Sequence, residues 1–346
     1  LLNFSNFVTK LKFSAAFEYM CYAMLSLGSR LVPISPTVSN KLYQSSCLPK
    51  LCYAVEVMDI EKETLKEMES FHVKNSKMLQ GLPNQAPNAA SLCTIGWNTI
   101  EACVEVCRLL FMWRILLLPM ENIYKSAMMK RLIKHINNPD GGYGPVYKMY
   151  KICWKYGLVH ILYNSIMTGN FMTMERWKKL VKDCILPRDR RRLTVNGCLC
   201  KSLLLVSQNT WNSGKILSWW SYVTCNVGNI NRCRIIVRLL LNTYRFGNKT
   251  CMLCDANQPD TIPHIMFECN GFPNSRDTLW ENLVTSGPQN LGEGLGNMNN
   301  SRKCELILNC LNCDFVPEWT DLYTNMCIYI STLYSEYMKS LNMLSE

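Results

Sequence analysis

The chain has 346 residues, of which 48% are hydrophobic, and a formal net charge of +11. This length and apolar content suffice for one large or two to three smaller folded units, so we expect a globular protein. The most apolar window, Leu109 to Pro119, contains Arg114 and is much shorter than the roughly 20 residues that span a bilayer, so we expect a soluble chain with no membrane partner.

Residues 1–136 are predicted to form a helical region with short connections. Within it, the segment 61–80 has apolar residues at helical spacing, Asp59 before it as an N-cap, and Gly81 after it as a stop. Strand signals are weak throughout this region. The fold class is therefore expected to be mainly α.

A second helix is predicted from Asn98 to Pro119, with Glu101 three residues after the start as an approximate capping box. This helix is apolar on most faces, so it should be a buried core helix. The intervening segment 81–97 contains several prolines and glycines and is predicted to be a loop.

The positive charge is concentrated in the middle of the chain. Residues 1–124 carry 11 basic and 10 acidic side chains, residues 125–250 carry 22 and 4, and residues 251–346 carry 4 and 12. A middle third with a net charge of +18 should attract a polyanion, with nucleic acid the leading candidate and a membrane surface the second. After a turn-rich linker at 137–145, we expect a basic helical connector over 146–247.

The segment 146–157 is predicted to be a helix with a basic stripe beside an aromatic face. The stripe consists of Lys148, Lys151 and Lys155, and the face of Tyr147, Tyr150 and Trp154. Two interpretations are open. Either the aromatic side chains are core and the lysines a solvated rim, or the lysines contact phosphates beside aromatic side chains that stack on bases.

The segment 175–193 holds the densest run of cations in the chain. Because few acidic residues accompany it, we favour phosphate contacts or a localisation signal over a merely solvated surface. The candidate nucleic-acid-binding residues in this run are Arg176, Lys178, Lys179, Arg188, Arg190, Arg191 and Arg192. Further along, an apolar helix punctuated by arginines is predicted within 210–247, with Trp219 and Trp220 as core residues.

A Cys-x2-Cys pair is followed by a His-x4-Cys pair within residues 251–269. In a chain with 19 cysteines one Cys-x2-Cys pair is expected by chance, but a His-x4-Cys so close downstream is expected only about 0.01 times. Zinc favours four thiolate or imidazole ligands in a tetrahedron, so we predict a structural Zn²⁺ site that leaves no ligand position open for catalysis. Its ligands are Cys251, Cys254, His264 and Cys269.

A second pair, Cys310 and Cys313, has no histidine near it and is a much weaker candidate ligand set. The residues after 286 open with a Gly- and Asn-rich stretch that is predicted to be a flexible linker. Beyond it, residues 319–341 have a helical pattern and could pack on the rest of the chain.

The cysteines are scattered singly and lack the compact spacing of a secreted disulfide framework, so we interpret them as reduced, buried thiols. This favours an intracellular protein of the nucleus and/or cytoplasm over a secreted one. The chain begins at Leu1 without a signal-peptide pattern, which suggests a fragment or a processed piece.

The stretch RFGNKTCMLCDANQPDTIPHIMFECNGF, followed by Arg276 and LWENL, resembles the carboxyl-terminal region of non-LTR (LINE-like) retrotransposon reverse transcriptases, where a Cys-Cys-His-Cys zinc knuckle follows the polymerase thumb. Upstream, residues 42–97 look like the stretch after the palm of that family. Pro49, Tyr53, Glu56, Gly81-Leu82-Pro83 and Ile95-Gly96 match its pattern, and Ala54 stands where the family usually has glycine. The resemblance covers roughly residues 25–285.

The resemblance implies four segments: a thumb-like helical region (1–136), the basic connector (146–247), a Cys-Cys-His-Cys zinc module (248–285), and a linker with helices (286–346). It also implies RNA and/or DNA and the upstream reverse transcriptase domains as partners. Phosphate contacts are expected mainly outside the zinc module, because Asp255, Asp260 and Glu268 make that module acidic.

Catalysis in this family requires palm aspartates that hold two magnesium ions, and this sequence contains no Asp-Asp pair. An endonuclease pattern after Cys269 is also absent. We therefore expect a non-catalytic, nucleic-acid-binding piece of an RNA-directed DNA polymerase. Two alternatives stay open: a degenerate retroelement remnant without activity, or the tail of a polymerase that is active only with its upstream palm.

Overall fold

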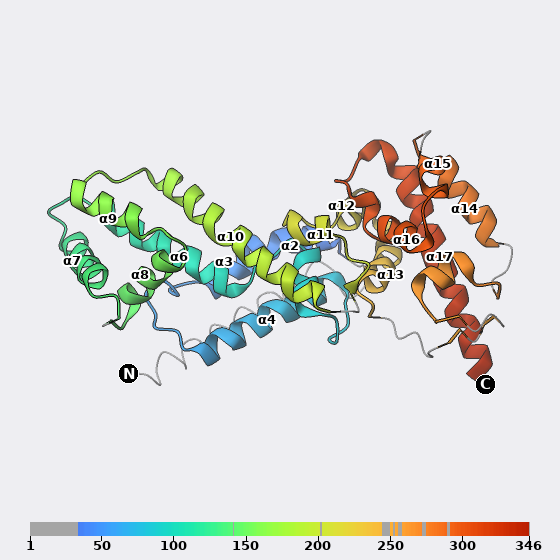
Figure 1. Ribbon diagram of the computed structural model, residues 1–346, viewed down its shortest axis with the longest axis horizontal. Helices are drawn as coiled ribbons and strands as arrows, with labels where there is room; N and C mark the ends of the chain where they lie inside the picture. The colour runs from blue at the N-terminus through green and yellow to red at the C-terminus, as the bar shows by residue number, and fades with distance from the viewer. Residues whose placement is uncertain are drawn as a thin grey trace. The chain divides into compact units, whose positions relative to one another are not determined.

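The computed structural model describes residues 34–140, 142–200, 203–243, 250–251, 253–254, 258–271, 275–288 and 291–345. In these ranges the regular structure is entirely helical, so the predicted mainly α fold is confirmed (Figure 1). The chain packs as two compact units. Unit 1 comprises residues 41–73 and 98–192, and unit 2 comprises residues 34–40, 74–97 and those from 193 onward. The four segments predicted above divide the chain by composition, whereas these units divide it by packing.

Three helices contribute residues to both units: α2 (Pro36–Leu42), α4 (Lys62–Gln80) and α10 (Met174–Cys198). Unit 1 also contains the π-helical turn η1 (Tyr43–Cys47) and the helices α3 (Leu48–Leu51), α6 (Ile100–Leu116), α7 (Ile123–Asn137), α8 (Pro145–Lys155) and α9 (Val159–Thr168). The remaining elements of unit 2 are α5 (Asn88–Thr94), α11 (Gln208–Ser213), α12 (Ser218–Cys225), η3 (Val227–Asn229), α13 (Ile230–Leu240), η4 (His264–Glu268), α14 (Ser275–Thr285), α15 (Leu291–Gly296), α16 (Asn300–Leu308), η5 (Cys310–Asn312), η6 (Pro317–Trp319) and α17 (Thr320–Ser345).

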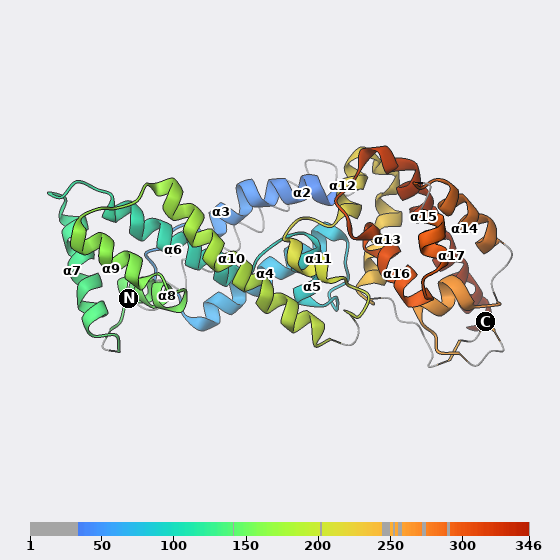
Figure 2. The same ribbon diagram turned by 45° about the horizontal axis from the view of Figure 1, so that its top comes forward.

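The core of unit 1 is formed by α6 to α10, and within it α6 and α10 lie side by side (Figures 1 and 2). The indole rings of Trp113 and Trp177 stack with their centroids 3.9 Å apart and an interplanar angle of 10°. The Trp177 indole donates a hydrogen bond of 3.0 Å to the carbonyl of Leu109, so the buried polar atom is satisfied. As predicted, α6 is a buried core helix.

The beginning of α6 differs from the predicted capping box. Its N-cap is Thr99, whose hydroxyl accepts from the Ala102 amide, so the prediction of Asn98 as the cap is wrong by one residue. Two long-range contacts decide this position. The Thr99 amide donates to Asp189 Oδ2 at 2.8 Å, and the Ile100 amide donates to Glu69 Oε2 at 2.7 Å. Because these partners come from α10 and α4, local sequence could not reveal them.

The predicted helix over 61–80 is confirmed as α4, and Gly81 terminates it with φ = 66°. The Leu82 amide donates to the Lys77 carbonyl at 2.8 Å, which completes a glycine-terminated C-cap. Asp59 is not the N-cap, because the helix begins at Lys62 and the Asp59 carboxylate forms an ion pair with Lys148.

The predicted loop at 81–97 contains the seven-residue helix α5. Its anchor is Gln80, whose side-chain amide donates to the Ser91 carbonyl at 2.8 Å and whose oxygen accepts from Thr94 Oγ1 at 2.7 Å. The prediction failed because so short a helix, bounded by proline and glycine, shows no periodicity in sequence. Buried hydrogen bonds hold it in place.

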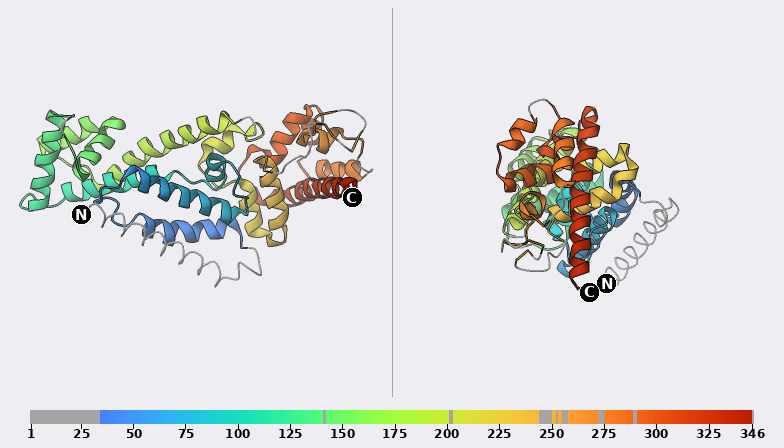
Figure 3. Two further views of the ribbon diagram at one scale, coloured as in Figure 1. Left: turned by 90° about the horizontal axis from the view of Figure 1, so that it is seen from below. Right: turned by 90° about the vertical axis from the view of Figure 1, so that its right-hand side faces the viewer.

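In unit 2, Trp219 and Trp220 are fully buried, as predicted. The Trp219 indole donates to the Leu308 carbonyl at 2.8 Å. The predicted carboxyl-terminal helix is α17, which packs against α13 and α14 (Figure 3). The predicted flexible linker is wrong in part, because α15 forms within it. Burial of Leu295 outweighs the poor helix propensity of its glycines.

Among the residues that the structure describes, no helix combines the length and the apolar character needed to cross a membrane.

His72 is a buried histidine in unit 1 with both ring nitrogens bonded. Its Nε2 lies 3.0 Å from the Asn98 carbonyl oxygen, which can only accept, so Nε2 carries the proton. The Tyr43 hydroxyl therefore donates to Nδ1 at 2.9 Å. The neutral ring is satisfied, and burial lowers the pKa of His72 from 6.5 to about 4.

We expect unit 1 to lose stability in mild acid through His72. Its folded pKa lies below its ordinary value, so the stabilisation is present above pH 6.5 and is lost as the pH falls towards 4. The loss should amount to roughly 2–3 kcal/mol. Urea unfolding across this pH range should show a steeper decline for the wild type than for His72→Gln. His160→Gln, at an exposed histidine on α9, should follow the wild type, and identical pH slopes in all three proteins would contradict the assignment.

Candidate metal centre and basic surface

The four predicted zinc ligands converge in unit 2. One ligand atom from each of Cys251, Cys254, His264 and Cys269 lies within 4.8 Å of all the others. The Sγ atoms of Cys251 and Cys269 are 3.7 Å apart, and Cys254 Sγ is 3.4 Å from His264 Nε2. Three cysteines and one histidine thus form a cluster that could hold a metal ion.

These separations fit a tetrahedral ion. Bonds of about 2.3 Å to sulfur and about 2.0–2.1 Å to nitrogen place two thiolates about 3.8 Å apart, and a thiolate and an imidazole about 3.6 Å apart. The observed 3.7 Å and 3.4 Å are close to these values, while the largest separation, 4.8 Å, requires a small contraction on binding. All four positions would be filled by protein, so no coordination site is left for water or substrate.

A π-helical turn, η4, creates the second half of the cluster. The amide of Cys269 donates to the carbonyl of His264 at 2.7 Å, an i to i+5 bond that brings these two ligands to the same side of the turn. In the first half, the Cys251 amide donates to the Gln258 carbonyl at 2.8 Å. The described part of the spacer, residues 258–263, thus returns the chain to the first pair, as the Pro- and Asp-rich sequence predicts.

The candidate ligands lie within residues 251–269, called the metal turn below. Three hydrogen bonds fix this turn to the helices around it. The Tyr329 hydroxyl donates to the Met266 carbonyl at 2.7 Å, and the Tyr337 hydroxyl donates to Asp260 Oδ2 at 2.5 Å. Arg276 on α14 donates to the Cys269 carbonyl at 3.0 Å. The site is therefore built into the helical packing of unit 2.

Burial raises the pKa of the Cys269 thiol to about 12, and the neighbouring thiols of Cys251 and Cys254 contribute to the rise. A divalent cation stabilises thiolates and reverses this preference. Metal binding should therefore release protons and weaken as the pH falls.

Glu268 contacts the cluster without being one of its four candidate ligands, and this contact was not predicted from the sequence. Its Oε2 lies 3.7 Å from His264 Nδ1, the ring nitrogen away from Cys254, and its Oε1 accepts from Asn300 Nδ2 at 2.9 Å. The 3.7 Å separation is too long for a hydrogen bond, and the buried Nδ1 atom has no hydrogen-bond partner among the described residues. A carboxylate in this position orients a ligating histidine once the two atoms come within hydrogen-bond distance. The spacing His264 to Glu268, four residues within one turn, was the available signal.

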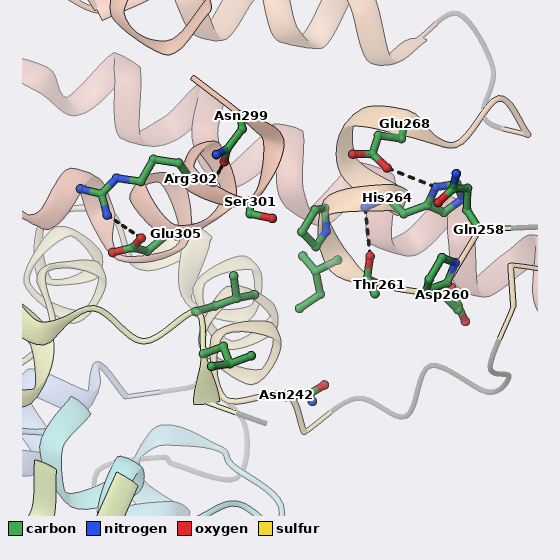
Figure 4. Close-up of a pocket in the computed structure, with 15 residues that line it drawn as sticks. Asn242, Gln258, Asp260, Thr261, His264, Glu268, Asn299, Ser301, Arg302 and Glu305 are labelled. Carbon is green, nitrogen blue, oxygen red and sulfur yellow. Dashed lines mark hydrogen bonds and ion pairs between the residues drawn. The ribbon is translucent and has the colours of Figure 1, made fainter. Parts of the chain in front are cut away.

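A cleft of about 770 Å³ lies between the metal turn and the start of α16 (Figure 4). Asp260, Thr261, His264 and Glu268 line one side, and Asn299, Arg302 and Glu305 line the other. The single arginine is paired with Glu305 at 2.5 Å. Carboxylates outnumber cations in this cleft, so it is unsuited to phosphate. Of the acidic residues noted in the sequence, Asp255 lies outside the described residues.

Among the described residues, the second cysteine pair, Cys310 and Cys313, does not join other metal-ligating side chains into a cluster. Cys310 is buried, and Cys313 donates only to the Cys310 carbonyl and contacts the Tyr323 hydroxyl. Among the residues that the structure describes, the Cys251 cluster is the group of metal-ligating side chains that meets the geometric requirement.

The predicted basic residues fall into two groups, one of which is engaged within unit 1. Lys155 pairs with Glu105 at 2.7 Å, and Arg192 pairs with Glu101 at 2.6 Å. Lys148 pairs with Asp59, and Arg188 donates to the carbonyl of Lys155 at 2.6 Å. Lys151 makes a long contact with Asp140 at 4.0 Å, and Arg190 is half-buried. Lys148, Lys155, Arg188 and Arg192 thus hold parts of unit 1 together. The Asp140 partner of Lys151 is 98% exposed, so this long contact contributes little.

The second group is exposed and makes no ion pair within the described ranges. It consists of Arg176, Lys178, Lys179 and Arg191 on α10, with Lys182 on the same helix. Helix α7 adds three exposed cations that were not among the predicted nucleic-acid-binding residues: Lys130, Arg131 and Lys134. Their clustering within one short helix was the available signal.

The fold and site define a helical protein with a closed Cys3His cluster and an exposed basic surface. Comparison of the chain with protein-family models, with curated proteins and with solved structures finds no match. Its function is therefore argued from the chemistry of these two features.

Proposed function

We propose that this chain binds RNA or DNA through the exposed cations of α10, and that its Cys3His cluster holds a structural zinc ion. We propose further that it is the carboxyl-terminal region of a non-LTR retrotransposon reverse transcriptase, with the upstream polymerase domains as its partners. The binding proposal is carried by the run of exposed cations on one helix, which make no ion pair with any described residue and lie in a segment with a net charge of +18.

Zinc is favoured over other metals by the donor set. Thiolates and imidazole suit zinc, whereas magnesium and calcium require oxygen ligands. Four protein ligands at tetrahedral separations are typical of structural zinc and leave no position for a catalytic water. The ion would fix the metal turn against α14 and α17.

The backbone at Ala54 supports the reverse transcriptase proposal. In the family pattern this position is usually glycine, and here Ala54 has φ = 63°. A left-handed conformation is readily adopted by glycine but costs about 1–2 kcal/mol for other residues. The fold therefore requires a left-handed backbone at position 54, where the family pattern usually has glycine.

Replacing Ala54 with glycine should stabilise unit 1. Relief of the left-handed strain exceeds the entropy that glycine loses on folding, for a net gain of about 0.5–1 kcal/mol. Chemical denaturation measures the change in the free energy of unfolding. The control is Ala127→Gly, at an exposed position of α7, which should destabilise unit 1 by a similar amount. A destabilised Ala54→Gly would argue against a strained Ala54.

The chain alone should not polymerise, because its sequence has no Asp-Asp pair to hold magnesium. A retroelement remnant that has lost activity, and a polymerase tail that needs its palm, share this expectation. They differ in binding, which a degenerate remnant need not retain.

Binding is tested by fluorescence anisotropy of labelled RNA with the full chain over a range of salt concentrations. Affinity should fall steeply with salt, because each phosphate contact releases a counterion. Absence of binding at low salt would refute the proposal and leave the inactive remnant. Metal analysis should find about one zinc per chain.

A further inference from the structure

Trp154 is set apart from the other tryptophans by its exposure. All nine tryptophans lie in described ranges, and six of them are at most 2% exposed, whereas Trp154 is 66% exposed. It lies on α8, where Tyr150 on the adjacent turn is buried in the core of unit 1. Since burial of a tryptophan is strongly favourable, an exposed indole on a well-packed helix indicates a contact surface.

A lysine lies beside this indole. Lys151 Nζ lies 5.8 Å from the centroid of the Trp154 ring and 5.3 Å from that of Tyr147. Arg188 of α10 donates to the Lys155 carbonyl at 2.6 Å and lies 5.3 Å from the Tyr156 ring. The basic helix α10 therefore reaches α8 one residue from Trp154.

We infer that Trp154 stacks on an unpaired base of a single-stranded nucleic acid, while Lys151 contacts an adjoining phosphate. This inference rests on the proposed nucleic-acid binding and specifies the form of nucleic acid that is bound. An aromatic ring beside cations is the surface that single strands use, because every base has a face that can stack and every linkage a charge.

A duplex does not fit this surface. Its bases are stacked on one another, so their faces are closed to an external indole, and its phosphates alone could reach α8. Trp154 therefore adds affinity for single strands that duplexes cannot gain. The chain should therefore prefer single strands to duplexes, a preference that attraction between charges alone does not give.

The test compares a labelled oligouridine and a labelled DNA duplex in binding to the full chain and to Trp154→Ala. Stacking on one base contributes about 1–3 kcal/mol, so the variant should bind the single strand about 5- to 160-fold more weakly. Duplex affinity should stay within about twofold. Trp154→Phe should retain most of the single-strand affinity. Tyr124→Ala, at a 70% exposed tyrosine on α7, should bind both probes like the wild type.

The outcomes separate this inference from the proposed function. Unchanged single-strand binding in Trp154→Ala, or an equal loss for both probes, would overturn the stacking role while nucleic-acid binding stands. Failure of the wild type to bind either probe would overturn both. Thermal unfolding of Trp154→Ala should match the wild type, because the side chain is exposed, and a large drop would indicate a structural role instead.

Discussion

Loss of the metal is expected to unfold the turn of residues 251–269 and to lower the thermal stability of unit 2. Without an ion, three thiols and an imidazole are left packed against one another, Cys251 beside Cys269 and Cys254 beside His264. Structural zinc ions bind with about 10–16 kcal/mol in small metal domains at neutral pH. Although the hydrogen bonds of Tyr329 and Tyr337 hold the turn, they do not replace the four metal bonds.

Cys269→Ala tests this directly, with Cys304→Ala as its matched control. Both cysteines are fully buried in unit 2, and Cys304 Sγ lies 3.9 Å from Met266 Sδ of the metal turn, but only Cys269 belongs to the cluster. Metal analysis should find about one zinc per chain in the control and little in Cys269→Ala. A chelator should lower the melting temperature of the control but not that of Cys269→Ala. Equal metal content in the two variants would refute the ligand assignment.

The metal ligands could be predicted from sequence because the information is local. Two short spacings and a turn-forming spacer define the cluster, and the fold only had to leave that geometry intact. The outer contact of Glu268 with Asn300 joins the turn to α16 and depends on packing.

The basic surface could be predicted only in part. Composition identified the segment, but the division between engaged and free cations depends on partners far away in sequence, such as Glu105 for Lys155 and Asp59 for Lys148. The same long-range contacts moved the cap of α6 from Asn98 to Thr99. Sequence thus predicted the helices well, and failed where a tertiary contact decides which polar group is satisfied.

Replacing four α10 cations with alanine is expected to weaken nucleic-acid binding about 10²- to 10³-fold near 0.1 M salt. The four are Arg176, Lys178, Lys179 and Lys182. Each contact with a single strand contributes about 0.7 to the slope of log affinity against log salt. The slope of the variant should therefore be smaller by about 3 if all four cations contact phosphates.

The control removes the same charge from elsewhere in unit 1. The four lysines are exposed and lie outside α10, so their replacement with alanine leaves that helix intact: Lys41 on α2, Lys50 on α3, and Lys62 and Lys66 on α4. This variant should bind within about threefold of the wild type, because net charge at a distance is screened over a Debye length of about 10 Å.

A third variant separates binding from folding. Arg192→Gln breaks ion pairs with Glu101 and Asp189 at 2.6 Å and 2.9 Å, so it should lower the stability of unit 1 by about 1 kcal/mol and change affinity little.

If the control and the α10 variant lost affinity equally, binding would depend on net charge and not on a surface. Because the α10 cations face solvent without partners in the described residues, whereas Arg192 joins α10 to α6, the structure predicts opposite consequences for charges in one run of sequence.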